Sequence, residues 1–340
     1  MSSPAASHSR GDDQQRHLPT KVILDLSIHS ISYNTSDTQP APRQKQSSLQ
    51  ETMPPISFKP SKLTQPQPPT KYTLISYPSP GVLLVTINRP KELNCLHTAA
   101  NHELEAIWSW LDAEPSLSVG ILTGTGRAFC AGADLKEWNA ANKSSTPRTM
   151  PPSGFGALSR RSGKKPILAA VNGICYGGGC EMIINADMVI ASSRATFALP
   201  EVKIGVVAAA GALPRLIRTV GKPRAMEMAL TGRPVGAREA ERWGLVNCVV
   251  EDGEEKGSRQ GEGVVAKAVE LAGLIAGNSP DAVRVSREGV MLGWEGIGVE
   301  EGTERVLEQW MPKLSKGENL KEGVRAFVEK RKPKWVASKL

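Results

Sequence analysis

The clearest fold signal in the chain is the segment GGGCEMIINADMVIASSRATFALPE, residues 177–201. Its glycine triplet predicts a tight turn into a helix over 180–186, and the apolar runs that follow predict two strands. Two of its carboxylates are distinguished by what precedes them. Glu181 follows the glycines, and Glu201 follows a proline at the end of a strand-like run. Acids in such apolar surroundings are candidates for a chemical role, and the alternative is a freely solvated acid at a helix start.

A second glycine turn, AGAD at residues 131–134, also precedes a predicted helix. The N-terminus of a helix presents unpaired N–H groups and the positive end of the helix dipole. Glycine lets a ligand approach the backbone closely. Two such turns that face each other can hold one oxygen between two N–H donors, which is an oxyanion hole. The sequence leaves open whether the turns face each other, and the alternative is that the glycines only allow a helix to pack tightly on a strand.

The segments on either side show strands with helices first and helices alone later. A polar loop of the kind that varies between relatives and moves is predicted over 139–165. The remaining patterns predict strands over 72–78, 81–90 and 118–126, a helix over 99–115, and mostly helix from residue 263 onward. This order indicates one α/β domain with a C-terminal helical part.

Composition narrows the class of protein. Residues 1–70 hold ten of the 25 prolines and are predicted to be a disordered, low-complexity extension. The five cysteines are odd in number and form no CxxC pair, so neither a disulfide framework nor a metal site is expected. No apolar run approaches the roughly 20 residues that span a bilayer, so no membrane partner is expected. The net charge of +8 permits nucleic acid, but a solvated basic surface is the preferred interpretation.

Six sequence blocks in order resemble the enoyl-CoA hydratase/isomerase family, also called the crotonases. The blocks are VTINRP, RAFCAGADLKE, KPILAAVNGICYGGGCE, ATFALPEVKIGVV, RTVGKPRAMEMALTGRPVGAREAERWGLV and KEGVRAFVEKRKPKW. The resemblance implies an α/β spiral of ββα repeats over 71–262 and a helical trimerisation part over 263–337. It also implies an acyl-CoA substrate, no further cofactor because coenzyme A is part of that substrate, and a homotrimer or a dimer of trimers.

The same resemblance assigns roles to residues in the two glycine turns and to the two acids. Ala133 and Gly178 would supply the oxyanion donors, and Glu181 and Glu201 would flank the substrate double bond and share a water. Glu181 would activate the water at C3, and Glu201 would transfer a proton at C2. The coenzyme A side would be lined by Ala131, Ala133, Asp134, Leu135, Lys136 and Gly178.

Retention of both acids favours a hydratase, which adds water reversibly, in a syn sense, to a trans-2-enoyl-CoA to give a 3-hydroxyacyl-CoA. Its setting would be peroxisomal fatty-acid β-oxidation, or a specialised pathway such as fungal siderophore or toxin synthesis. One alternative is an isomerase that moves a 3,4 double bond to the 2,3 position, for which Glu201 alone can suffice. Another is a protein of the same fold that binds RNA without catalysis.

Two further features bear on substrate and location. Hydratases often carry PGAGG after the second glutamate, where this chain has AAAGA at residues 208–212, so the shape of the acyl pocket is expected to differ. The chain ends in Ser338, Lys339 and Leu340, a tripeptide that the peroxisomal import receptor reads at a C-terminus. A peroxisomal enzyme is therefore expected.

Overall fold

The structure is a computed structural model that describes residues 63–144, 149–251 and 261–340. They belong to one compact unit, residues 53–340. Most of the predicted extension, residues 1–62, lies outside the described residues. The predicted boundary at Lys71 is too late, because Thr64 and Gln65 donate their amides to the buried Glu114 carboxylate at 2.9 and 3.0 Å.

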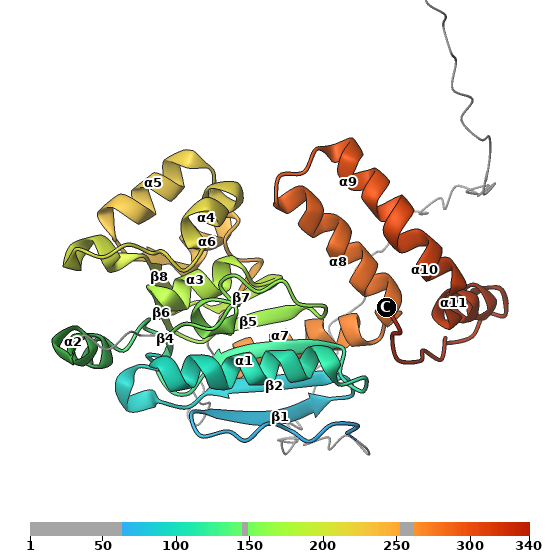
Figure 1. Cartoon of the computed structure of the whole chain (residues 1–340), viewed down its shortest axis with the longest axis horizontal. Coiled ribbons are helices and arrows are strands. Elements are labelled where there is room, and N and C mark those ends of the chain that lie inside the picture. Colours follow the sequence, from blue (N-terminus) through green and yellow to red (C-terminus); the bar gives the residue numbers. More distant parts are fainter. Residues whose placement is uncertain (1–62, 145–148, 252–260) are drawn as a thin grey trace, which may run out of the picture. The chain divides into compact units, whose positions relative to one another are not determined.

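The larger of two sheets has six strands in the order β1-β2-β3-β5-β7-β10 (Figure 1). These strands are β1 (Thr73–Ser79), β2 (Val82–Ile87), β3 (Val119–Gly124), β5 (Ile167–Val171), β7 (Met188–Ser192) and β10 (Cys248–Val250). β1 and β2 form an antiparallel hairpin, and the other neighbours are parallel. Parallel neighbours need crossover connections, which explains the helices between the strands.

The smaller sheet has the order β4-β6-β8-β9, with β9 antiparallel to β8. Its strands are β4 (Ala128–Cys130), β6 (Ile174–Tyr176), β8 (Thr196–Ala198) and β9 (Val235–Gly236). Three successive units each give one strand to the larger sheet, one to the smaller sheet and then a helix. The helices that close these units are α2 (Leu135–Ser144), α3 (Gly178–Ile184) and α4 (Ala212–Val220). This is the expected spiral of ββα repeats.

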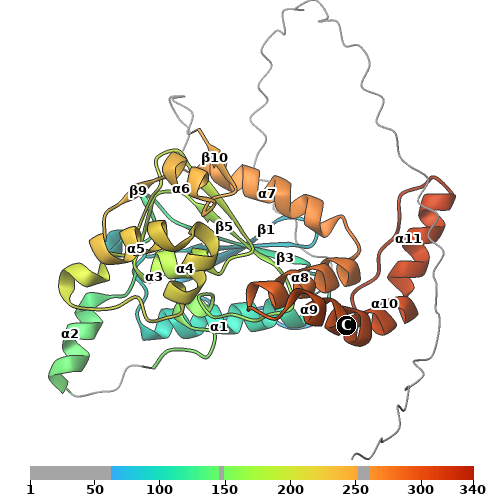
Figure 2. The same cartoon turned by 90° about the horizontal axis from the view of Figure 1, so that it is seen from above.

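The larger sheet is covered on both faces, and Figure 2 shows it between α1 (Thr98–Ala113) and α7 (Glu262–Ala276). All six residues of β3 are buried as a result, which explains its continuous apolar character. Trp108 of α1 belongs to the core on one face, and Val264 and Ala268 of α7 belong to the core on the other. The predicted helical part beginning at 263 therefore starts with a helix that packs on the sheet.

The remaining helices follow the core strands or end the chain. They are α5 (Lys222–Thr231), α6 (Ala237–Trp243), α8 (Pro280–Trp294), α9 (Val299–Arg305), α10 (Met311–Lys316) and α11 (Glu318–Val328). Helices α8 to α11 form the C-terminal group, which exposes apolar side chains such as Phe327, 83% accessible. Within the described ranges, no helix is both long and apolar enough to cross a membrane.

Candidate active site

The two glycine turns lie against each other, which the sequence left open. A β-carbon added to Gly132 would lie 3.3 Å from the amide nitrogen of Gly178 and 3.6 Å from the Gly177 α-carbon. Gly132 and Gly177 have φ angles of +100° and +55°, which glycine adopts without strain. Leu96 pairs with the backbone on either side of Ala133, and no hydrogen bond within the described residues occupies the amides of Ala133 or Gly178. The arrangement can therefore offer two N–H groups to one oxygen.

Gly178 is also close to an aromatic ring. A β-carbon at Gly178 would lie 2.6 Å from the ring of Phe155, which is closer than real β-carbon contacts. Phe155 is buried and comes from the segment between α2 and β5. The aromatic ring therefore packs directly on the α-carbon of the predicted oxyanion donor.

Glu181 lies in the first turn of α3 and is only 4% exposed. Its Oε1 accepts a hydrogen bond of 3.3 Å from the amide of Ala212, at the start of α4. Burial raises the pKa of Glu181 to about 7, against the opposing Ala212 hydrogen bond and with added repulsion from Glu201. A carboxyl group with this pKa can both take up and release a proton near neutral pH.

Glu201 lies in the short 3₁₀ helix η3 (Pro200–Ile204), directly after β8. Its Oε1 would be 3.3 Å from a β-carbon at Gly177, so this carboxylate adjoins the second glycine turn. Its Oε2 is buried without a hydrogen-bond partner among the described residues, and burial raises the pKa of the group. A buried acceptor without a partner is costly in a structural role, which favours a functional role.

The residues predicted on the coenzyme A side surround the first turn, at the start of α2. Leu135 and Lys136 are exposed there, and Ala131 is half-buried. Asp134 forms an ion pair of 3.0 Å with Arg89 and accepts the amide of Lys136 at 3.1 Å. Its carboxylate is thus occupied in holding the turn and the start of α2.

The departure from the usual hydratase motif, residues 208–212, forms the turn before α4. The Ala208 side chain is buried in the core. Gly211 has a φ of +123°, where a side chain would be strained, and a β-carbon there would meet the Ser159 carbonyl oxygen at 3.0 Å. The turn therefore packs on the segment that carries Phe155.

The predicted polar loop over 139–165 is wrong at residues 139–144, which are helical, and at 154–159, which are buried and closely packed; residues 145–148 lie outside the described residues. Gly154, Gly156 and Ala157 all have positive φ angles. The signal in the sequence was the compact run GFGALS, residues 154–159, whose glycines and apolar residues were obscured by polar neighbours.

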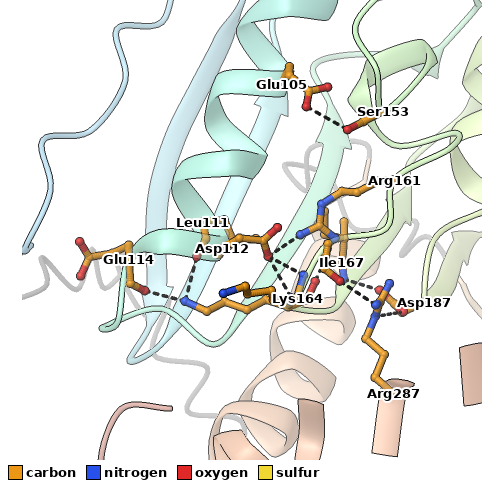
Figure 3. Close-up of polar contacts among 12 residues, drawn as sticks. Glu105, Leu111, Asp112, Glu114, Ser153, Arg161, Lys164, Ile167, Asp187 and Arg287 are labelled. Atoms are coloured by element: carbon orange, nitrogen blue, oxygen red, sulfur yellow. Dashed lines mark hydrogen bonds and ion pairs between the residues drawn. The ribbon is translucent and has the colours of Figure 1, made fainter. Parts of the chain in front are cut away.

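A polar network outside the site anchors the segment that carries Phe155 (Figure 3). On one side, Ser153 donates to Glu105 of α1 at 2.9 Å, and Arg161 pairs with Asp112 at 2.6 Å. On the other side, Arg287 of α8 pairs with Asp187 at 2.6 Å, and its guanidinium also donates to the carbonyl of Gly163 at 2.8 Å. The ends of the segment are thus attached to both the core and the C-terminal helices.

The C-terminal tripeptide lies beside α11. Lys339 forms an ion pair of 2.6 Å with Glu318, and the amide of Leu340 donates to the Ser338 hydroxyl at 3.2 Å. Upstream of the tripeptide, Asn319 bonds both the amide and the carbonyl of Val336, at 2.9 and 3.0 Å. The chain end is therefore ordered against the last helix.

Comparisons with known proteins agree with this geometry. The family model described as enoyl-CoA hydratase/isomerase matches residues 78–338. A mevalonyl-coenzyme A hydratase of Aspergillus fumigatus is 52% identical over 277 residues, which cover 82% of this chain and 99% of that protein. A carnitinyl-CoA dehydratase of Proteus mirabilis is 36% identical over 260 residues, which cover 75% of this chain and 95% of that protein.

Solved structures give the same result for the fold. The crystal structure of an enoyl-CoA hydratase from Mycobacterium tuberculosis superposes with a TM-score of 0.70 and 32% identity, covering 78% of this chain and 99% of that one. The expected crotonase-like α/β fold is confirmed, and so is the expected hydro-lyase class, because these relatives are hydratases and dehydratases. The chain belongs to the enoyl-CoA hydratase/isomerase family, the crotonases, and is a hydratase of that family.

Proposed function

We propose that this hydratase interconverts mevalonyl-CoA and the branched 2-enoyl-CoA formed when mevalonyl-CoA loses water. The observation that carries the proposal is the 52% identity to a mevalonyl-coenzyme A hydratase across 99% of that relative's length. A second such hydratase, from Beauveria bassiana, is also 52% identical, over 283 residues. The substrate assignment favours a specialised acyl-CoA pathway over general β-oxidation.

The roles proposed for the site residues follow from their positions. The Ala133 and Gly178 amides would hold the thioester oxygen and stabilise the negative charge that develops on it. In the hydration direction, Glu181 would take a proton from water as its oxygen attacks C3. Glu201 would deliver a proton to C2, and in dehydration both transfers run in reverse. The pKa values of both acids are raised by burial, which suits groups that exchange protons during the reaction.

Spectrophotometry tests this proposal directly. The conjugated enoyl thioester absorbs in the ultraviolet, so its formation from mevalonyl-CoA can be followed continuously. Parallel assays of the hydration of crotonyl-CoA and of a long-chain 2-enoyl-CoA measure specificity. We expect the largest kcat/KM with mevalonyl-CoA. Preference for a straight-chain 2-enoyl-CoA would contradict the substrate assignment but retain the hydratase.

Two further proposals concern assembly and location. A homotrimer, or a dimer of trimers, is supported by the exposed apolar side chains Val324, Phe327 and Val328 on α11, because such surface costs free energy in water. Analytical ultracentrifugation would test it, and a monomer at micromolar concentration would contradict it.

Peroxisomal import through Ser338–Leu340 is supported by the terminal tripeptide. Deletion of Leu340 should leave a fluorescent fusion in the cytosol.

A further inference from the structure

Ser159 is the buried hydroxyl that connects the two sides of the site. It is 0% exposed and lies in the segment that the sequence did not identify as functional. Its Oγ accepts the amide of Phe155 at 2.8 Å and donates to the carbonyl of Ala210 at 2.7 Å. A hydroxyl group can accept one hydrogen bond and donate another at the same time. A methyl group can do neither, and an ammonium group can only donate.

The first of these hydrogen bonds affects the oxyanion side. It fixes the backbone of Phe155, whose ring packs against the α-carbon of Gly178. The adjacent amide of Gly156 is held by Asn101 at 2.6 Å, so this turn has little freedom to move. A shift of the Phe155 ring would change the space beside the Gly178 N–H group.

The second hydrogen bond affects the acid–base side. Ala210 lies two residues before Ala212, whose amide contacts Glu181. Between them, Gly211 passes close to the Ser159 backbone, where a β-carbon would lie 3.0 Å from the Ser159 carbonyl oxygen. Displacement of the Ala210 carbonyl would therefore move the amide that contacts the Glu181 carboxylate.

We propose that Ser159 is a positioning residue that holds the Phe155 ring against the Gly178 oxyanion donor and the Ala212 amide against the Glu181 acid–base group. The inference rests on the proposed roles of these two groups in hydration. It extends them, because Gly178 and Glu181 both lie on α3 while the groups that contact them, the Phe155 ring and the Ala212 amide, come from elsewhere in the chain, and Ser159 holds the backbone at both places through one atom. Misplacement of catalytic groups by about 1 Å can cost on the order of 10²-fold in rate.

The fold contains a second attachment that should keep a Ser159 variant folded. Arg215 of α4 donates to the Gly211 carbonyl at 3.0 Å and to the Asn185 side chain at 2.9 Å. Asn185 in turn donates to the carbonyl of Leu158 at 2.8 Å. Loss of the Ser159 hydroxyl should therefore loosen the site without releasing the turn.

The test compares Ser159→Ala with Ser159→Thr, which keeps the hydroxyl. The matched control is Thr123→Val, because the Thr123 hydroxyl is also buried and donates to a carbonyl, that of Ala170, at 2.8 Å on the sheet. We expect Ser159→Ala to lower kcat roughly 10- to 100-fold, as for misplaced catalytic groups, with KM changed less than about threefold. Thr123→Val should lose stability but keep kcat, and Ser159→Thr should recover much of the activity.

The pH profile separates positioning from simple loss of stability. Without the Ala212 amide in place, the ionised form of Glu181 is less stabilised, so the acid limb of kcat should move to higher pH in Ser159→Ala. A bound aromatic enoyl-CoA chromophore should also show a smaller red shift, because its carbonyl is less polarised.

Two results would overturn the inference. One is wild-type kcat and pH profile in a folded Ser159→Ala protein. The other is an equal loss of kcat in Thr123→Val. If Ser159→Ala does not fold, Ser159→Cys, which is nearly isosteric and a weaker donor, undergoes the same assays. Wild-type turnover tests the proposed hydration separately, so an inactive wild type is distinguishable from an insensitive Ser159 variant.

Discussion

Glu114 and Glu181 are both buried glutamates, yet their carboxyl groups have opposite properties. Glu114, at the end of α1, is 0% exposed, and Glu181, on α3, is 4% exposed. Burial acts to raise the pKa of Glu114, but hydrogen bonds from Ser116, Gln65 and Thr64 together lower it to about 2. Burial raises the pKa of Glu181 to about 7, with added repulsion from Glu201 and against hydrogen bonds from the amides of Ala212, Ala210 and Gly211.

The pKa of a buried acid therefore depends on the balance between its desolvation and the donors that reach it. A carboxylate surrounded by N–H and O–H groups stays charged and contributes to stability. A carboxyl group whose desolvation outweighs its donors is held near its point of ionisation, which costs stability and permits proton transfer. Four experiments test the contrast between these carboxyl groups and the site that contains Glu181.

The largest effect is expected from the two acids of the site. Glu181→Gln and Glu201→Gln should each lower kcat by about 10²–10⁴-fold, because each removes a proton-transfer group and keeps its size. Enoyl thioester absorbance measures the loss, and circular dichroism checks folding. If Glu201→Gln retained full hydratase activity, Glu201 would not be a partner of Glu181.

Gly178→Ala should lower kcat by about 10²–10³-fold, the cost of losing one oxyanion donor. The added methyl group would collide with the Phe155 ring and displace the N–H group. Gly236→Ala is the matched control, because Gly236 has an ordinary φ of −74° and open space around its α-carbon. Equal activity of the two variants would contradict the role of Gly178.

Glu114→Gln should lower the free energy of unfolding by about 2–3 kcal/mol, because hydrogen bonds to a charged acceptor are lost. Glu181→Gln should raise the free energy of unfolding at pH 8, because the ionised Glu181 is costly to bury there. Urea unfolding measures both, with the exposed Glu300→Gln as the control. If both buried variants lost stability equally, the proposed contrast between the two carboxyls would be wrong.

The smallest expected changes are in the pH dependence of activity and of stability. They should follow the same contrast between Glu114 and Glu181. Hydration should fall as pH decreases below about 7, because Glu181 must be ionised to accept a proton. Stability from Glu114 is fully present above pH 4.5 and is lost as pH falls toward 2. For Glu181 the sign is reversed, and stability falls as pH rises from 4.5 to about 7. An acid limb of hydration near pH 4 would contradict the raised pKa of Glu181.

The sequence was sufficient where the physical signal was local. The apolar runs over 72–78 and 81–90 predicted β1 and β2, and the helical spacing over 99–115 predicted α1. The candidate acids were also visible, because each follows a distinctive turn residue. The segment around Phe155 was not predicted, because its burial depends on α1 and on the turn before α4, which are distant in the chain.

The order of strands and helices, the two glycine turns and the two candidate acids, Glu181 and Glu201, could all be predicted from the sequence. These follow from turn chemistry, hydrophobic period and motif spacing within short windows. Two features become visible only in the folded chain: the turns face each other, and the Ser159 hydroxyl bonds both the Phe155 amide and the Ala210 carbonyl. The fold also lowers the pKa of Glu114 to about 2 and raises that of Glu181 to about 7. These outcomes depend on which donors reach a buried oxygen from elements far apart in the chain, and no local pattern records that.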